Sequence, residues 1–361
     1  MAVFPTSILL LGLLTLSQSI FIPPSLTGPL PVGVVSYELN NTSTFPIRDL
    51  MVSIFYPALE SEYQKHRLQP DLPLVFANDY SDSWLDLPQN ASASVIQHAY
   101  NSPHISSSNF PVLFFSPGYG SGRLYYNGAA QNLASQGYIV VSLDHPNDTD
   151  FIVYPDGRTA TFNESTDDRT ETDVVLLRVS DNLFVLDHLE QSARENIPGL
   201  VGSLDTNRVG ILGHSAGGST AAQAMLNDTR FVAGINMDGP ASEPVESAGL
   251  DRPFLLMGQQ AHALNSSFDP TWTIFYNNLR GWKRAMIVNQ TIHHHFCDSL
   301  YFLEQLSADG YPEGEGYLNG TYMFGLESAY TANFFNKWMK GGKGELFHGP
   351  SEQWPEVIFD G

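Results

Sequence analysis

The sequence predicts an α/β fold in which a mostly parallel central sheet carries helices on both faces. Continuous apolar segments of strand length alternate along the chain with segments of helical spacing. One of these strands runs directly into the pentapeptide Gly213-His-Ser-Ala-Gly217, and an Ala-rich helical segment follows it. Strands that are apolar throughout, rather than at every second residue, are typical of parallel sheets covered on both faces.

Each element is predicted from its own pattern. Alternating polarity over 32–57 indicates strands, most clearly at 51–56. The remaining strands are expected where apolar runs occur, at 110–116, 137–143, 208–212, 231–237, 253–257 and 284–288. The expected helices are a short one around 93–100, one ending near 135, one over 173–190, one after Ser215 and a closing one over 329–340.

The first residues, 1–19, are expected to be a signal peptide. They contain no charged side chain, and their apolar run, 8–16, is too short to span a bilayer. The rest of the chain, 20–361, is interpreted as a single domain with small cap insertions at about 58–108 and 241–283. Nine Asn-x-Ser/Thr sequons also favour a secreted, extracellular glycoprotein: Asn40, Asn41, Asn90, Asn147, Asn163, Asn227, Asn265, Asn289 and Asn319.

Charge and cysteine content narrow the function classes. The formal charge of −21 argues against binding to nucleic acid and against charge-driven binding to anionic membranes. The single cysteine, Cys297, excludes an intramolecular disulfide, so the expected secreted protein must be stabilised by its core.

The pentapeptide around Ser215 has the G-x-S-x-G pattern of the nucleophile elbow of α/β-hydrolases. A sharp strand-to-helix turn strains the backbone at the serine and brings its flanks together, and Gly213 and Gly217 avoid the collision of Cβ atoms there. The pattern therefore predicts Ser215 as a catalytic nucleophile.

The catalytic acid and base are expected after later strands, in the order serine, acid, histidine. Asp238 directly follows strand 231–237 and is the predicted acid, whereas the next strand is followed by no acid before Asp269. His293 is the first histidine after strand 284–288 and is the predicted base. His294 and His295 are expected to cover a helix start or face solvent, because consecutive residues point in different directions and make a poor metal site.

The oxyanion hole needs two backbone N–H groups directed at the developing charge. One is expected from Ala216, at the start of the helix after the nucleophile. The other is expected from Tyr119, in the Gly-rich loop that follows strand 110–116. This loop lacks the lysine and spacing of a phosphate-binding loop, and we expect neither a cofactor nor a metal ion.

Beyond these motifs, the chain from about residue 33 to its end resembles the secreted or type II platelet-activating factor acetylhydrolases (group VII phospholipase A2), most of all a fungal member. The segments that carry the resemblance are Phe114-Phe-Ser-Pro-Gly-Tyr-Gly, Gln136-Gly-Tyr-Ile-Val-Val with Asp144-His145, Arg178 with Asp181 and Asp187, Gly213-His-Ser-Ala-Gly-Gly, Met-Asp238-Gly-Pro and His293-x-x-Phe-x-Asp298. The resemblance implies a triad of Ser215, Asp238 and His293, with Tyr119 and Ala216 as oxyanion donors. It also implies calcium-independent hydrolysis of a short sn-2 acyl ester of a phospholipid, with transient contact to a lipid surface.

Two alternatives stay open at this point. The same signature occurs in esterases of other small or polymeric esters, so the chain is alternatively a general secreted carboxylesterase or polyester hydrolase. A non-catalytic binding module with the same fold is the other alternative. Reaction of Ser215 with a fluorophosphonate separates this module from both enzymes, and a panel of ester substrates separates the two enzymes from each other.

Overall fold

The computed structural model describes residues 23–44, 46–70, 72–79, 93, 95–162, 167–306 and 317–361. The expected signal peptide therefore lies outside the described residues. The strands are β1 (Val32–Asn41), β2 (Arg48–Pro57), β3 (Leu68–Pro70), β4 (Ile96–Asn101), β5 (Val112–Ser116), β6 (Ile139–Leu143), β7 (Phe151–Val153), β8 (Thr159–Thr161), β9 (Val209–His214), β10 (Phe231–Met237), β11 (Phe254–Gln259), β12 (Lys283–Val288) and β13 (Val357–Phe359). The α-helices are α1 (Leu74–Asp79), α2 (Asn127–Ser135), α3 (Glu171–Asn196), α4 (Ala216–Asn227), α5 (Val245–Ala248), α6 (Pro270–Asn278), α7 (Ser299–Leu306) and α8 (Gly320–Met339).

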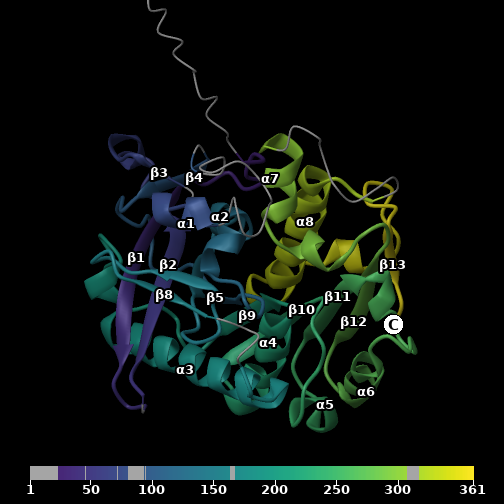
Figure 1. Ribbon diagram of the computed structural model, residues 1–361. Helices are drawn as coiled ribbons and strands as arrows, with labels where there is room; N and C mark the ends of the chain where they lie inside the picture. Colours follow the sequence, from purple (N-terminus) through teal and green to yellow (C-terminus); the bar gives the residue numbers. More distant parts are fainter. Residues whose placement is uncertain are drawn as a thin grey trace, which may run out of the picture.

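Eleven of the described strands form one sheet, in the order β13-β12-β11-β10-β9-β5-β6-β2-β1-β4-β3. The six strands from β12 to β6 pair in parallel. The long strand β2 is antiparallel to both of its neighbours, β1 and β6. In Figure 1 the sheet runs from β1 and β2 on the left to β12 and β13 on the right. The predicted mostly parallel sheet is therefore confirmed.

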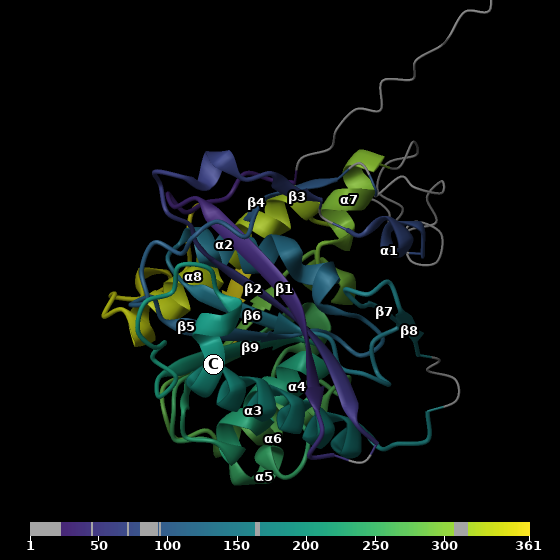
Figure 2. The same ribbon diagram turned by 90° about the vertical axis from the view of Figure 1, so that its left-hand side faces the viewer.

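Helices cover both faces of this sheet. In both views α2, α7 and α8 lie on one side of the strands, and α3, α4, α5 and α6 lie on the other (Figures 1 and 2). Successive residues of β5 pack into different cores: Leu113 and Phe115 belong to the core under α2 and α8, whereas Val112 and Phe114 belong to the core over α3 and α4. A strand that is buried on both faces needs an apolar residue at every position, which explains the continuous apolar pattern of β5.

The structure differs from the predicted elements at the edges of the sheet. The prediction of a helix around 93–100 is wrong, because Ile96–Asn101 forms strand β4, which pairs in parallel with β1. Its residues alternate between buried and half-buried, so it lacks the continuous apolar run of a central strand, and its pairing with β1 and β3 outweighs the helical propensity of a short segment. Strand β13 was not predicted either, and the closing helix α8 begins at Gly320 rather than near 329.

The parallel strands bring their carboxyl ends to one edge of the sheet. The neighbouring strands β5, β9, β10, β11 and β12 each lead into a loop or turn at this edge. Ligand and catalytic sites of open α/β sheets form at such edges. In the described ranges no helix is both long enough and apolar enough to cross a membrane.

Candidate active site

Ser215 occupies a strained turn between β9 and α4. Its backbone angles are φ 55° and ψ −128°, a conformation that residues with a side chain rarely adopt. A Cβ atom on Gly213 would collide with the carbonyl of Gly217, and one on Gly217 would collide with the carbonyl of Ser116. The two glycines therefore make the turn sterically feasible, as the nucleophile elbow requires.

Asp238 and His293 are hydrogen-bonded to each other. Asp238 directly follows β10, and His293 begins a 3₁₀ turn (His293–Phe296) after β12. The Nδ1 of His293 donates to Oδ2 of Asp238 at 2.7 Å. Burial alone would raise the pKa of Asp238, but hydrogen bonds from His262 and His293 outweigh it and hold this pKa well below its usual range. Asp238 is therefore a carboxylate that orients the imidazole of His293.

Two further residues bind the same carboxylate. The backbone N–H of Gln259 donates to Oδ1 of Asp238 at 2.7 Å, and its side-chain Nε2 donates to Oδ2 at 2.9 Å. His262 Nδ1 also contacts Oδ1 at 2.7 Å. Gln259 ends β11 and His262 follows it, and β11 is the strand between those that lead to Asp238 and His293. The sequence interpretation missed them, although a histidine in the loop after this strand was the available signal.

Asp269, the alternative acid, lies on the far side of His262. Its Oδ2 is 3.3 Å from His262 Nε2, and its Oδ1 accepts hydrogen bonds from the N–H and the hydroxyl of Thr271. It caps the start of α6. The structure thus brings Asp238, rather than Asp269, to the imidazole of His293.

The other histidines at this edge have structural contacts. His295 is buried, with Nδ1 accepting from the Ile292 N–H at 3.0 Å and Nε2 2.9 Å from the Leu318 carbonyl. His214 lies 2.9 Å from the hydroxyl of Tyr126 and packs its ring 4.5 Å from that of His293. Among the described residues, no three His, Cys, Asp or Glu side chains gather as a metal-binding group.

The loop after β5 is held by the buried guanidinium of Arg178. This group donates to the carbonyls of Pro117 at 2.5 Å and Gly118 at 2.9 Å, and it forms an ion pair with Asp148. With these carbonyls bound, the neighbouring amides are free to point elsewhere. Within the described part of the chain, neither the Tyr119 nor the Ala216 N–H has an acceptor, as an oxyanion hole requires.

Replacing Arg178 with Met is expected to destabilise the fold and slow turnover together. Removing one partner of a buried ion pair leaves the other unpaired, which costs about 3–5 kcal/mol. The carbonyls of Pro117 and Gly118 lose their donor as well. Urea unfolding and steady-state kinetics check this. Unchanged turnover in a destabilised Arg178→Met variant would show that the guanidinium stabilises the fold without shaping the loop.

A cavity of about 320 Å³ opens beside Ser215. Its described lining residues are Tyr119, Arg169, Glu171, Val174, Ser215, Ala216 and Pro240. The hydroxyl of Tyr119 donates to Asp167 at 2.5 Å, and the guanidinium of Arg169 forms two hydrogen bonds to the same carboxylate. The cavity thus has the candidate nucleophile and both candidate oxyanion donors in its wall, and opposite charges at Arg169 and Glu171.

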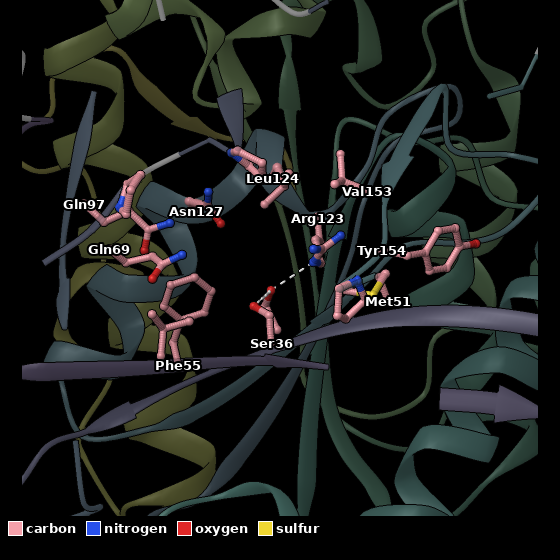
Figure 3. A pocket seen from close by; sticks show the side chains of 15 residues that line it. Ser36, Met51, Phe55, Gln69, Gln97, Arg123, Leu124, Asn127, Val153 and Tyr154 are labelled. Atoms are coloured by element: carbon pink, nitrogen blue, oxygen red, sulfur yellow. Dashed lines mark hydrogen bonds between the residues drawn. The ribbon is translucent and has the colours of Figure 1, made fainter. Parts of the chain in front are cut away.

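A second cavity, of about 210 Å³, shares none of these lining residues (Figure 3). Arg123 faces it, but its Nε donates to Ser53 Oγ at 2.9 Å and its guanidinium is paired with Asp144. Among the described lining residues this is the only cationic group. The described lining of the second cavity contains no histidine, aspartate or glutamate to act as a base beside its serines, so the cavity beside Ser215 is the candidate site.

The chain is similar to a described protein family and to proteins named as esterases or acetylhydrolases. Residues 92–301 match the family model described as PET hydrolase-like, a range that contains Ser215, Asp238 and His293. The chain is 30% identical to a probable 1-alkyl-2-acetylglycerophosphocholine esterase of Arthroderma benhamiae, with 94% of each chain covered. It is 27% identical to the platelet-activating factor acetylhydrolase of Cavia porcellus, over 56% of this chain and 51% of that one.

A solved esterase structure has a fold similar to that of this chain. The ferulic acid esterase of Streptomyces cinnamoneus superposes with a TM-score of 0.82 at 28% identity, covering 94% of this chain and 99% of the other. This relative and those above are described as ester-cleaving enzymes or as hydrolases. The chain therefore belongs to the PET hydrolase-like family, alongside acetylglycerophosphocholine esterases and platelet-activating factor acetylhydrolases, and is a carboxylic ester hydrolase with an α/β-hydrolase fold.

Proposed function

We propose that the chain is a secreted serine esterase that removes the short sn-2 acyl group of a phospholipid, releasing acetate and a lyso-phospholipid. Ser215 is the nucleophile, His293 the general base and Asp238 the residue that orients it. The hydrogen bond between His293 and Asp238 carries this proposal, because the His293 ring packs 4.5 Å from that of His214, the residue before the strained Ser215 turn. The similarity to the Arthroderma benhamiae esterase supports the substrate class.

In the proposed reaction, Ser215 Oγ bonds to the ester carbonyl carbon as its proton passes to His293. The backbone N–H groups of Tyr119 and Ala216 stabilise the negative charge that develops on the carbonyl oxygen. His293 then gives its proton to the departing lyso-phospholipid oxygen. A water molecule, deprotonated by His293, then bonds to the acyl carbon, and the bond to Ser215 Oγ breaks as His293 returns the proton to Oγ, releasing acetate. Asp238 stabilises the imidazolium in both halves. Since His293 must be neutral to act, activity falls in acid.

The volume of the cavity beside Ser215 supports a substrate with a small acyl group. About 320 Å³ lies near the lower end of the range for small-molecule sites, which suits an acetyl group and the adjacent glycerol better than a long acyl chain. Arg169 and Glu171 supply opposite charges, as a zwitterionic head group would require. Secretion is supported by exposed sequons, including Asn147, Asn227 and Asn265, whereas Asn41 is buried.

A general carboxylesterase or polyester hydrolase is the second candidate. The PET hydrolase-like family match and the ferulic acid esterase neighbour favour it. A panel of short-chain and long-chain sn-2 phospholipids, nitrophenyl esters, a feruloyl ester and a polyester film separates the two. We expect the highest kcat/KM on the sn-2 acetyl phospholipid. Equal or higher values on feruloyl or polymeric esters would contradict the proposed substrate.

Replacing Arg169 with Gln is expected to raise KM for the acetyl phospholipid by about 3–10-fold, because a charge-assisted hydrogen bond to the phosphate is lost at a partly exposed site. Nitrophenyl acetate, which has no phosphate, should change less than about twofold. Arg280→Gln is the matched control, since Arg280 is exposed and paired with Asp251. A uniform loss on both substrates would assign Arg169 to support of Asp167 and Tyr119 instead.

A further inference from the structure

His262 joins two carboxylates, one of which is the proposed catalytic acid. Its Nδ1 lies 2.7 Å from Oδ1 of Asp238, and its Nε2 lies 3.3 Å from Oδ2 of Asp269. A neutral imidazole has a single N–H and satisfies only one acceptor, whereas the imidazolium donates from both nitrogens. All three side chains are buried. The geometry therefore fits a charged His262 between two carboxylates.

The surrounding residues hold this ring in one orientation. His262 ends a 3₁₀ turn (Gln260–His262) and stacks on Trp272, with ring centroids 4.8 Å apart and an interplanar angle of 20°. The indole N–H of Trp272 donates to the Gly239 carbonyl at 2.6 Å, next to Asp238. Asp269 is fixed by Thr271 at the start of α6. The ring is thus held on its flat face by Trp272 and at Nδ1 by Asp238, with Asp269 as its ion-pair partner at Nε2.

Burial favours the neutral form of this imidazole, but its partners favour the cation. Burial lowers the pKa of His262, whereas the hydrogen bonds and charges of Asp238 and Asp269 raise it, and the pKa reaches about 9. His262 is then protonated throughout the neutral range. The other group packed against it is the ring of Phe268, which carries no charge.

The charge on His262 acts on His293 through the carboxylate that they share. Asp238 attracts a proton to His293, and a cation on the opposite oxygen offsets that attraction. The titratable groups that face His293 are Asp238, His214 at 4.5 Å and His294 at 5.9 Å between ring centroids. Of these, Asp238 is the anion, so its neutralisation changes the field at His293.

We propose that His262 is a positioning residue of the esterase reaction: as an imidazolium shared with Asp269 it fixes the Asp238 carboxylate and keeps His293 free of a proton in mildly acidic medium. This inference rests on the proposed triad of Ser215, Asp238 and His293. It assigns to the Asp269–His262 pair a role in setting the pH range of activity. A serine esterase loses its general base to protonation in acid, so such a pair would extend its activity to lower pH.

The test is the pH profile of kcat/KM on nitrophenyl acetate for the full chain and for His262→Gln. Glutamine retains a donor for Asp238 but carries no charge. The midpoint of the acid limb should move to higher pH by about 0.5–1 unit, because removing a nearby cation makes His293 easier to protonate. KM should stay within about twofold, and turnover above this limb should fall by less than about tenfold. His104→Gln, which removes an exposed histidine beside Glu62, is the matched control and should leave the limb in place.

Asp269→Asn provides a second variant in which the imidazole stays in place. It should move the acid limb by a smaller amount and to lower pH, because His262 stays charged beside Asp238 and the loss of the Asp269 anion leaves that charge less compensated. An unmoved acid limb in folded His262→Gln and Asp269→Asn overturns the inference. Fluorophosphonate labelling of the unsubstituted protein is run beside these assays. Absence of labelling overturns the serine mechanism and with it the role of His262, whereas labelling with an unmoved limb overturns the role of His262 alone.

Discussion

Replacing Ser215 with Ala is expected to lower kcat by about 10⁴–10⁶-fold and to abolish labelling by a fluorophosphonate. The reason is that the variant keeps the cavity and the backbone N–H groups but loses the oxygen that bonds to the ester carbon. Intact-protein mass spectrometry after labelling, together with steady-state kinetics on nitrophenyl acetate, checks both effects. Residual catalysis above the uncatalysed rate would then come from the Tyr119 and Ala216 amides.

Ser219→Ala is the matched control for this experiment. Ser219 lies one turn further along α4, is buried, and donates to the Pro240 carbonyl at 2.6 Å. Its loss should lower stability slightly and leave labelling intact. Labelling of Ser215→Ala at the unsubstituted level would place the nucleophile elsewhere and remove the basis of the proposed reaction.

The strained backbone at Ser215 also allows a test by protein stability at the same position. At φ 55° and ψ −128° an alanine keeps the strain, whereas a glycine is free of it. Ser215→Gly is therefore expected to be more stable than Ser215→Ala by about 1 kcal/mol. A higher Tm for the glycine variant would show that the turn stores strain for function, because both variants lack the hydroxyl.

The parallel core of the fold could be predicted because its strands are buried on both faces. Residues 112–116 and 231–237 are apolar almost throughout, so their pattern leaves few other readings. Strands near the two ends of the sheet lack this constraint. β4 pairs with β1, and the edge strand β13 pairs with β12, and a local sequence pattern does not show partners so far apart in the chain.

The same distinction applies to the site. Ser215 could be predicted from a local motif, and Asp238 and His293 could be predicted from their positions directly after strands. The neighbours that complete the arrangement meet only in three dimensions. Arg178 reaches the loop after β5 from α3, and His262 reaches Asp238 from the 3₁₀ turn that follows β11, the strand between those of the acid and the base. Their residue types were visible in the sequence, but their partners were not.

The choice between the two carboxylates has the second largest expected effect. Asp238→Asn should lower kcat by about 10³–10⁴-fold, because an amide that donates to His293 favours the wrong imidazole tautomer for taking the Ser215 proton. The substitution also replaces a carboxylate oxygen with an NH₂ group, which donates rather than accepts, beside Gln259 and His262. Steady-state kinetics at pH 8, above the acid limb, measures this loss without interference from protonation of the base.

Asp269→Asn is the matched carboxylate-to-amide change and should retain turnover within about tenfold at the same pH, since Asp269 contacts His262 and Thr271 rather than the base. The pH dependence of unfolding of the unsubstituted protein tests the ionisation of Asp238 independently. The pKa of Asp238 is lowered on folding, so its contribution to stability is present above its unfolded pKa of about 3.9 and is lost as pH falls below it. Asp238→Asn should remove that part of the acid sensitivity of unfolding. Full turnover in Asp238→Asn with loss in Asp269→Asn would instead make Asp269 the acid and would require His262, the imidazole that it contacts, to be the base.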